Sequence, residues 1–267
     1  MNLFTRTRLL LGDENIEKLK NARVAVFGLG AVGSYAVEAL ARVGVGYLRL
    51  VDFDRVDPSN VNRQLYALNS TVGREKAEIA EGRVRDINPN VELDMHPAFV
   101  NADSLVDLLS PDLDLVVDAI DGLNSKVNLI VGAREMGLEV VSSMGAGGRL
   151  DPTKVAVGDI SKTHTCPLAR AVRRRLHRRG VFKGVNCVYS LEAPVKSPLS
   201  AQDPAGALAE GDAPITAPVS TRVDEDPASS SHGRERPPIG TIPWVPGIFG
   251  LTLASEAVGL ITRKSES

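Results

Sequence analysis

Two cations and a carboxylate in the first half of the chain, Arg63, Lys76 and Asp121, have types and spacing that suit phosphate chemistry. Arg63 and Asp121 follow apolar runs that indicate buried strands, and Lys76 begins an expected helix. The carboxyl ends of parallel strands face one crevice, so the three side chains can converge there. They would brace a triphosphate while Asp121 holds Mg²⁺ during attack at phosphorus. Singly, solvated surface charges or a helix cap at Asp121 explain them equally well.

A glycine-rich loop precedes these residues. Gly28, Gly30 and Gly33 form GxGxxG between an expected strand and an expected helix, where glycine lets backbone amides approach a phosphate. Asp52 ends the next strand, about 20 residues on, where a ribose hydroxyl is expected. Helix–strand packing without a ligand is the plainer alternative. An NAD oxidoreductase is favoured only if the loop after Asp52 points away from the crevice.

The elements that position these residues alternate between strands and helices. Residues 22–52 read as strand, helix and strand, which implies a parallel sheet. Helices at 73–88, 101–110 and 125–138 and strands at 91–100, 113–120 and 139–152 continue the alternation. We therefore predict an α/β fold: a Rossmann-like, doubly wound, mostly parallel sheet with a C-terminal extension and a disordered insertion.

The second half of the chain departs from this alternation. We expect a strand at 155–160, a strongly basic helix at 166–180, a strand at 185–192 and a final buried helix after residue 239. The segment 194–238 is rich in Pro, Ala, Ser, Gly and Asp and has few large apolar side chains. Such a segment buries too little surface to offset its ordering entropy, so we predict a flexible insertion.

Composition excludes several classes of protein. With 43% hydrophobic and 24% charged residues, the 267-residue chain has globular composition, and its net charge of -2 gives no overall attraction to nucleic acid. Two cysteines without a CxxC pair exclude a disulfide framework and a four-cysteine zinc site. The apolar run Leu9–Leu11 is too short for a signal peptide or a membrane span, so we expect a cytoplasmic protein.

The motifs GLGAVG, VDFDRVDPSNVNRQ, GREKAE and DAIDGLNSK resemble, in order and spacing, those of the ubiquitin-activating-like adenylating enzymes of the ThiF and MoeB type. The resemblance implies ATP and Mg²⁺ as cofactors, with Arg63, Lys76 and Asp121 catalytic and Asp121 the metal ligand. It also implies that residues 1–267 form one adenylation domain, with an ATP-binding part at 22–150 and a substrate-binding part at 151–193 and 239–267. The implied ATP-binding residues are Gly28, Gly30, Ala31, Gly33, Asp52, Asp54, Asn60, Arg63, Gln64, Lys76, Asp121 and Asn124.

A narrower resemblance covers nearly the whole chain outside the insertion. The stretches VSSMGAGGRLDP, GDISKTHTCPLARAVRRRL, VNCVYSLE and IPWVPGIFGLTLASEAV are similar to those of the tRNA threonylcarbamoyladenosine dehydratases. That family implies a ligase-type enzyme that adenylates the threonyl carboxylate and cyclises the modified adenosine beside the anticodon, as an oxazolone or a hydantoin. The alternatives are an adenylyltransferase for a ubiquitin-like sulfur carrier and, less favoured, a non-catalytic partner subunit. Any accessory sulfur-transfer protein stays unnamed.

Three further features of the sequence lead to predictions: the basic helix, the two cysteines and the N-terminal arginines. In the basic helix, Leu168, Val172 and Leu176 would face the core, leaving an arginine-rich surface for the tRNA backbone. The residues expected to contact tRNA are Arg170, Arg173, Arg174, Arg178 and Arg179.

Cys187 stands where the family carries a cysteine, which suggests a thioester intermediate, although a small buried strand residue explains it better. Cys166 is interpreted as structural, at the cap of the basic helix.

Relatives that dimerise insert an N-terminal arginine into the partner's ATP site, so we expect a homodimer in which Arg6, or else Arg8, plays this part. Solvent exposure is the alternative for both arginines.

Overall fold

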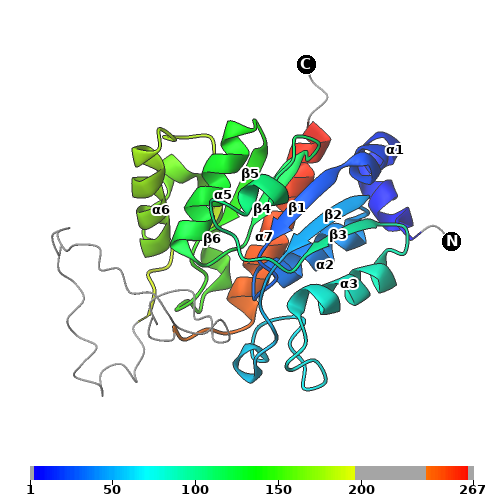
Figure 1. The fold of residues 1–267 in the computed structure, drawn as a ribbon, viewed down its shortest axis with the longest axis horizontal. Coiled ribbons are helices and arrows are strands. Elements are labelled where there is room, and N and C mark those ends of the chain that lie inside the picture. Colours follow the sequence, from blue (N-terminus) through cyan, green and yellow to red (C-terminus); the bar gives the residue numbers. More distant parts are fainter. Residues whose placement is uncertain (1–2, 196–238, 264–267) are drawn as a thin grey trace.

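One mixed sheet organises the molecule. The computed structural model describes residues 3–195 and 239–263, so the predicted insertion lies outside the described residues except for Pro194 and Val195. Seven strands follow the order β3-β2-β1-β4-β5-β7-β6 (Figure 1). All neighbouring pairs are parallel except the edge pair β6 and β7, so the predicted fold class is confirmed. The strands are β1 Arg23–Phe27, β2 Tyr47–Val51, β3 Glu92–His96, β4 Leu115–Asp118, β5 Glu139–Ser143, β6 Val155–Asp159 and β7 Asn186–Ser190.

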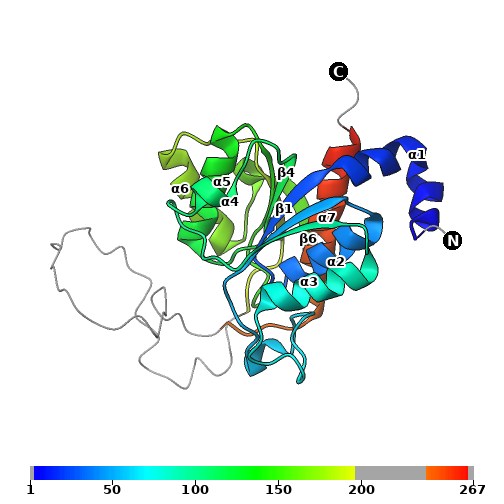
Figure 2. The same cartoon turned by 45° about the vertical axis from the view of Figure 1, so that its right-hand side comes forward.

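Helices cover both faces of this sheet, as Figures 1 and 2 show. One apolar core contains α2 (Gly33–Val43), α3 (Lys76–Ile87) and α7 (Trp244–Arg263). The core on the other face contains α4 (Leu105–Leu108), α5 (Leu123–Glu135) and α6 (Pro167–Arg178). Since the chain winds outward in both directions from β1 and β4, the strand order reverses between these two strands. Ligands of open α/β sheets bind at such a reversal.

The first helix, α1 (Thr5–Asn21), was not predicted. Gly12 interrupts it with φ of 80°, a conformation that favours glycine. Beyond this kink, Ile16 and Leu19 are buried, whereas Leu9 and Leu10 before it are 82% and 84% exposed. The apolar spacing of the second half is the signal that could have shown the helix, but the first half lacks a buried face.

The final helix, α7, packs closely on α2. A Cβ at Gly250 would lie 2.3 Å from the carbonyl oxygen of Val32, so only glycine permits this approach. α7 is long and apolar enough to cross a membrane by length and composition alone, but buried core helices share these properties. Its buried residues include Val245, Phe249 and Leu253, which belong to the core beneath the sheet.

Two details differ from the expected elements. The helix expected at 101–110 is a single turn, Leu105–Leu108, since Leu109 is already extended with ψ of 144°. In α6 the buried positions are Ala169, Val172 and Leu176, whereas Leu168 is only partly buried and packs against the same core. Leu168 lies one position round the helix and lines a cavity.

Candidate active site

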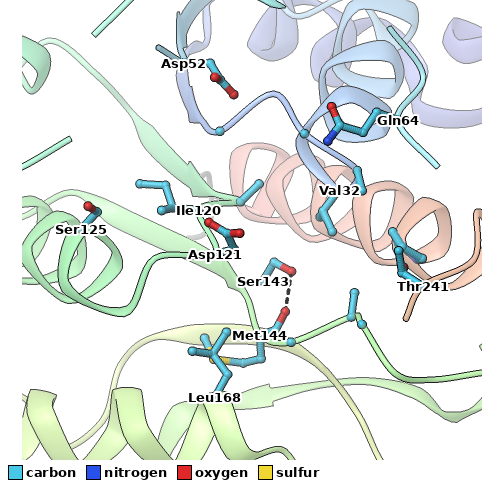
Figure 3. Close-up of a pocket in the computed structure, with 18 of the residues that line it drawn as sticks. Val32, Asp52, Gln64, Ile120, Asp121, Ser125, Ser143, Met144, Leu168 and Thr241 are labelled. Carbon is cyan, nitrogen blue, oxygen red and sulfur yellow. Dashed lines mark hydrogen bonds between the residues drawn. The ribbon is translucent and has the colours of Figure 1, made fainter. Parts of the chain in front are cut away.

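A cavity of about 560 Å³ opens at the carboxyl ends of β1, β2, β4 and β5, where the strand order reverses. Figure 3 shows Asp52 and Gln64 at one end, Met144 and Leu168 at the other, and Asp121 between them. The predicted site residues that line it are Gly28, Gly30, Ala31, Asp52, Asp54, Arg63, Gln64, Lys76 and Asp121. The fold thus brings together residues spread over nearly a hundred positions of sequence.

The glycine loop owes its shape to two close approaches. Gly28 has φ of 89°, and a Cβ there would lie 2.9 Å from the carbonyl oxygen of Ala119. A Cβ at Gly33 would lie 1.7 Å from the carbonyl oxygen of Gly28, so this glycine packs the start of α2 against the loop and does not line the cavity. Gly28, Gly30 and Ala31 leave backbone exposed to a ligand at the N-terminus of α2, which favours an anion.

Asp52 lies at the end of β2 and is 8% exposed. Its carboxylate accepts hydrogen bonds from the amides of Leu29, at 2.5 Å, and Asp54, at 2.8 Å. Burial raises the pKa of Asp52, and the charge of Lys76 with these two amides opposes the rise. A carboxylate has about four lone-pair positions, so two amide donors leave acceptor capacity for ribose hydroxyls.

The loop after Asp52 faces the cavity. An NAD oxidoreductase was favoured only if this loop pointed away from the crevice, so the structure does not favour that function. Asp54, Arg63 and Gln64 all line the cavity. Arg63 is held by its own loop, because its Nη1 donates to the carbonyl oxygen of Ser59 at 2.8 Å. Lys76 is only 4% exposed and its Nζ lies 2.7 Å from Asp54 Oδ2, so it is not a solvated surface cation. These polar groups exceed what a dinucleotide requires at this position.

Asp121 presents a carboxylate to the cavity without a hydrogen bond or ion pair to any residue that the structure describes. No group of three His, Cys, Asp or Glu side chains within residues 3–195 and 239–263 could hold a metal by itself. Mg²⁺ commonly uses one or two protein carboxylates and completes its coordination with substrate phosphates and water. The residues present therefore fit a metal shared with a bound nucleotide.

Besides Gly33, two predicted ATP ligands do not line the cavity. Asn60 is 9% exposed, and its Oδ1 accepts a hydrogen bond from the Asp57 amide at 3.3 Å within a 3₁₀ turn, Pro58–Asn60. Asn124, in the first turn of α5, points to α6, where its Oδ1 accepts a hydrogen bond from Arg175. Local turn and helix geometry directs both amides away from the crevice.

Other lining residues were not assigned from the sequence. Phe53 and Phe99 meet edge to face with ring centroids 5.0 Å apart, and with Val100 and Ile120 they form an apolar wall suited to a purine base. Arg149 and Cys166 line the opposite end. Their positions in the chain could have identified these residues, because Phe53 follows Asp52 directly and Arg149 ends the glycine loop after β5.

The two cysteines have different surroundings. Cys166 occupies the N-cap position of α6, as predicted, and it also lines the cavity. Cys187 lies in β7, next to the edge strand β6; it is fully buried in the core and does not line the cavity. Burial raises the pKa of the Cys187 thiol far above its usual range, which disfavours the thiolate that a thioester would need.

We expect Cys187→Ala to retain turnover within about threefold of the unsubstituted protein and to lose about 1 kcal/mol of unfolding free energy, as small buried residues commonly do. Steady-state rates and denaturant unfolding check the two effects separately. A folded but inactive Cys187→Ala protein would instead establish a covalent role for the thiol.

The glycine loop, the buried Asp52 and the polar loop after it meet in one crevice of an α/β sheet, an arrangement typical of nucleotide-binding proteins. The chain belongs to the ThiF family, whose sequence profile matches residues 4–267. It is 45% identical over 195 residues to the tRNA threonylcarbamoyladenosine dehydratase of Bacillus subtilis, covering 73% of this chain and 77% of that protein. The resemblance found in the motifs is thereby confirmed.

Solved structures agree. The tRNA N6-threonylcarbamoyladenosine dehydratase of Escherichia coli in complex with ATP superposes with a TM-score of 0.79 at 32% identity, covering 98% of this chain and 94% of that one. A more distant relative is the molybdopterin-synthase adenylyltransferase of Salmonella typhimurium, which is 33% identical over 70% of each chain.

Proposed function

We propose that the protein is an ATP-dependent tRNA threonylcarbamoyladenosine dehydratase. The observation that carries this proposal is that the glycine loop, Arg63 and the carboxylate of Asp121 all line one cavity. The similarity in sequence and structure to dehydratases, one of them solved with ATP, supports the same activity and ATP as its cosubstrate.

The reaction follows from the chemistry of the groups involved. One oxygen of the threonyl carboxylate attacks the α-phosphorus of ATP, and pyrophosphate leaves, so an acyl adenylate forms. The carbamoyl group of the same side chain then attacks the acyl carbon through its oxygen or a nitrogen, and AMP leaves with one former carboxylate oxygen. A proton is released as the ring closes. Intramolecular attack supplies proximity without an enzyme nucleophile.

The residues that line the cavity would have different roles in this reaction, according to where they lie. Asp52 would hold the ribose, and the loop from Gly28 to Ala31 with Arg63 would bind the phosphates. Lys76 is paired with Asp54, so it would contribute charge from a fixed place beneath the phosphates. Asp121 would hold Mg²⁺, which when bound neutralises phosphate charge.

The test of this function uses purified protein, ATP, Mg²⁺ and tRNA that carries threonylcarbamoyladenosine. After mild digestion of the tRNA, mass spectrometry should find the modified adenosine lighter by one water. If the nucleoside is unchanged while ATP still exchanges with pyrophosphate in the presence of a sulfur-carrier protein, the adenylyltransferase alternative replaces the dehydratase.

The tRNA contact is proposed on α6. Arg170, Arg174, Arg178 and Arg179 are exposed, whereas Arg173 is turned inward, with its Nη1 donating to the carbonyl oxygen of Thr163 at 2.6 Å. A second cavity of about 450 Å³, between α5 and α6, is lined by no acidic side chain among the described residues. Its lining consists of Asn124, Val127, Asn128, Arg175, Arg178 and Arg179. Such a surface suits backbone phosphates, which require cations and carry no sequence information.

Charge reversal on this surface should weaken tRNA binding. We expect Arg174→Glu with Arg178→Glu to lower tRNA affinity by at least about tenfold in moderate salt and to reduce the salt dependence by about 0.9 per lost phosphate contact. ATP affinity should stay unchanged. Filter binding at several salt concentrations measures this, and Arg42→Glu with Arg85→Glu, on α2 and α3, is the control of equal charge. Equal losses in both double variants would contradict a specific surface on α6.

A homodimer and a cytoplasmic location complete the proposal. Arg6 is exposed on α1 beside the exposed Leu9 and Leu10, and it does not line the cavity of its own chain. A second copy that covers these leucines could receive Arg6 in its ATP site. Arg8 is paired with Asp13, which favours Arg6 over Arg8. A tRNA substrate and two free cysteines agree with the cytoplasm.

A further inference from the structure

Arg149 is a buried cation with an unused donor. It is 3% exposed; its Nε donates to the carbonyl oxygen of Glu192 at 3.2 Å and its Nη1 to that of Gly147 at 2.9 Å. Its Nη2 has no hydrogen-bond partner, and no carboxylate pairs with the guanidinium, among the residues that the structure describes. A guanidinium stays charged in proteins, and an unpaired buried donor costs stability. The arrangement therefore suits an anion that arrives with a ligand.

The position of Arg149 separates it from the nucleotide end of the cavity. It follows β5, whereas the ribose carboxylate follows β2, and the strands β1 and β4 lie between them. Neighbouring strands are about 4.8 Å apart, so the two ends of the cavity are separated by roughly 14 Å. Asp121, after β4, lies between the two ends (Figure 3).

The N-terminus of α6 adjoins the same guanidinium. A Cβ at Gly145 would lie 3.5 Å from Arg149 Nη1 and 3.6 Å from the sulfur of Cys166, the residue that caps α6. Cys166 makes no side-chain cap, Pro167 has no amide hydrogen, and the first amides of a helix have no partner within it. Leu168 also lines the cavity here. The N-terminus of α6 and the Arg149 guanidinium thus lie close together at this end of the cavity.

We propose that Arg149 binds the carboxylate of the threonylcarbamoyl group and holds it for attack on ATP; this inference rests on the proposed function. Two backbone carbonyls hold the guanidinium in place. Nη2 has no partner among the described residues, so it would anchor one carboxylate oxygen and leave the other to approach the α-phosphorus. Arg63, Lys76 and Asp121 surround the phosphates on the other side, so Arg149 is not required for ATP.

The experiment measures binding in the full-length protein with two forms of one tRNA, with and without the threonylcarbamoyl group, and with ATP separately. Arg149→Gln should reduce the affinity for the modified tRNA about ten- to a hundredfold, as expected for a charged hydrogen bond, and leave unmodified tRNA and ATP unchanged. Arg149→Lys, which keeps the charge, should restore part of the difference. Arg85→Gln, an exposed arginine on α3, is the matched control.

Each other outcome overturns the inference in a distinct way. Equal weakening of both tRNAs would assign Arg149 to RNA phosphate, and weakening of ATP alone would assign it to the nucleotide. Loss of all binding in both Arg149 variants together with a lowered melting temperature would make it a structural residue that ties Gly147 to Glu192. If the unsubstituted protein neither prefers the modified tRNA nor dehydrates it, the proposed function fails first and the inference falls with it.

Discussion

Replacement of Asp121 by asparagine is expected to lower the rate of dehydration about a thousandfold, because several kcal/mol of charge stabilisation would be lost at the phosphates. The substitution keeps the size of the side chain and removes one negative charge. Asp121 is exposed to the cavity and unpaired among the described residues, so its removal should leave the fold intact. Single-turnover assays with ATP and modified tRNA measure the rate, and unchanged thermal melting verifies the fold.

A titration with Mg²⁺ distinguishes a metal ligand from other roles. The Asp121→Asn protein should need a higher Mg²⁺ concentration for its residual activity, whereas Asp107→Asn, an exposed carboxylate on α4, should behave as the unsubstituted protein. Activity of Asp121→Asn equal to that of the unsubstituted protein at ordinary Mg²⁺ would show that this carboxylate neither holds the metal nor acts on the phosphates.

Replacement of Lys126 by methionine is expected to reduce the unfolding free energy by about 3–5 kcal/mol, the usual effect of breaking a buried ion pair. Lys126 and Asp118 are both fully buried, with Nζ 2.7 Å from Oδ2. Ser142 adds a hydrogen bond to the same carboxylate oxygen at 2.6 Å. Without the ammonium, the carboxylate at the end of β4 stays in the core with a hydroxyl and a backbone amide as its partners among the described residues. Denaturant unfolding measures the loss.

The double variant Asp118→Asn with Lys126→Met should recover much of that loss, since neither charge is then left unpaired. Lys154→Met, at an exposed lysine whose Nζ is 3.8 Å from Asp151, should change the unfolding free energy by less than about 0.5 kcal/mol. A loss below about 1 kcal/mol in Lys126→Met would mean that water reaches the pair readily.

Much of the site could be predicted because local spacing governs it. GxGxxG before α2 predicted a turn that only glycine allows, and Gly28 and Gly33 meet at distances that exclude a Cβ. Arg63, Lys76 and Asp121 were predicted to converge because parallel strands present their carboxyl ends at one edge, and all three line the cavity. These arguments need only the alternation of elements, which a period of two or 3.6 residues reveals.

Other features depended on partners far away in sequence. Asn60 and Asn124 match the family motifs in sequence, yet a 3₁₀ turn and a contact with Arg175 direct their side chains elsewhere. A solvated surface charge remained the alternative for Lys76 until the fold placed this lysine beside Asp54. α1 escaped prediction because its exposed first half has no apolar stripe facing the core.

The sequence by itself therefore determined the class of fold, the family and the edge of the sheet at which ATP chemistry belongs, because these follow from periodicity and short motifs within a few residues of one another. Only the tertiary structure decided which cations are paired, that Cys187 is buried in the core and that Arg149 Nη2 has no partner among the described residues. The physical reason is that the charge, burial and reach of a side chain depend on neighbours brought by packing from other elements, and no local pattern records which neighbours those will be.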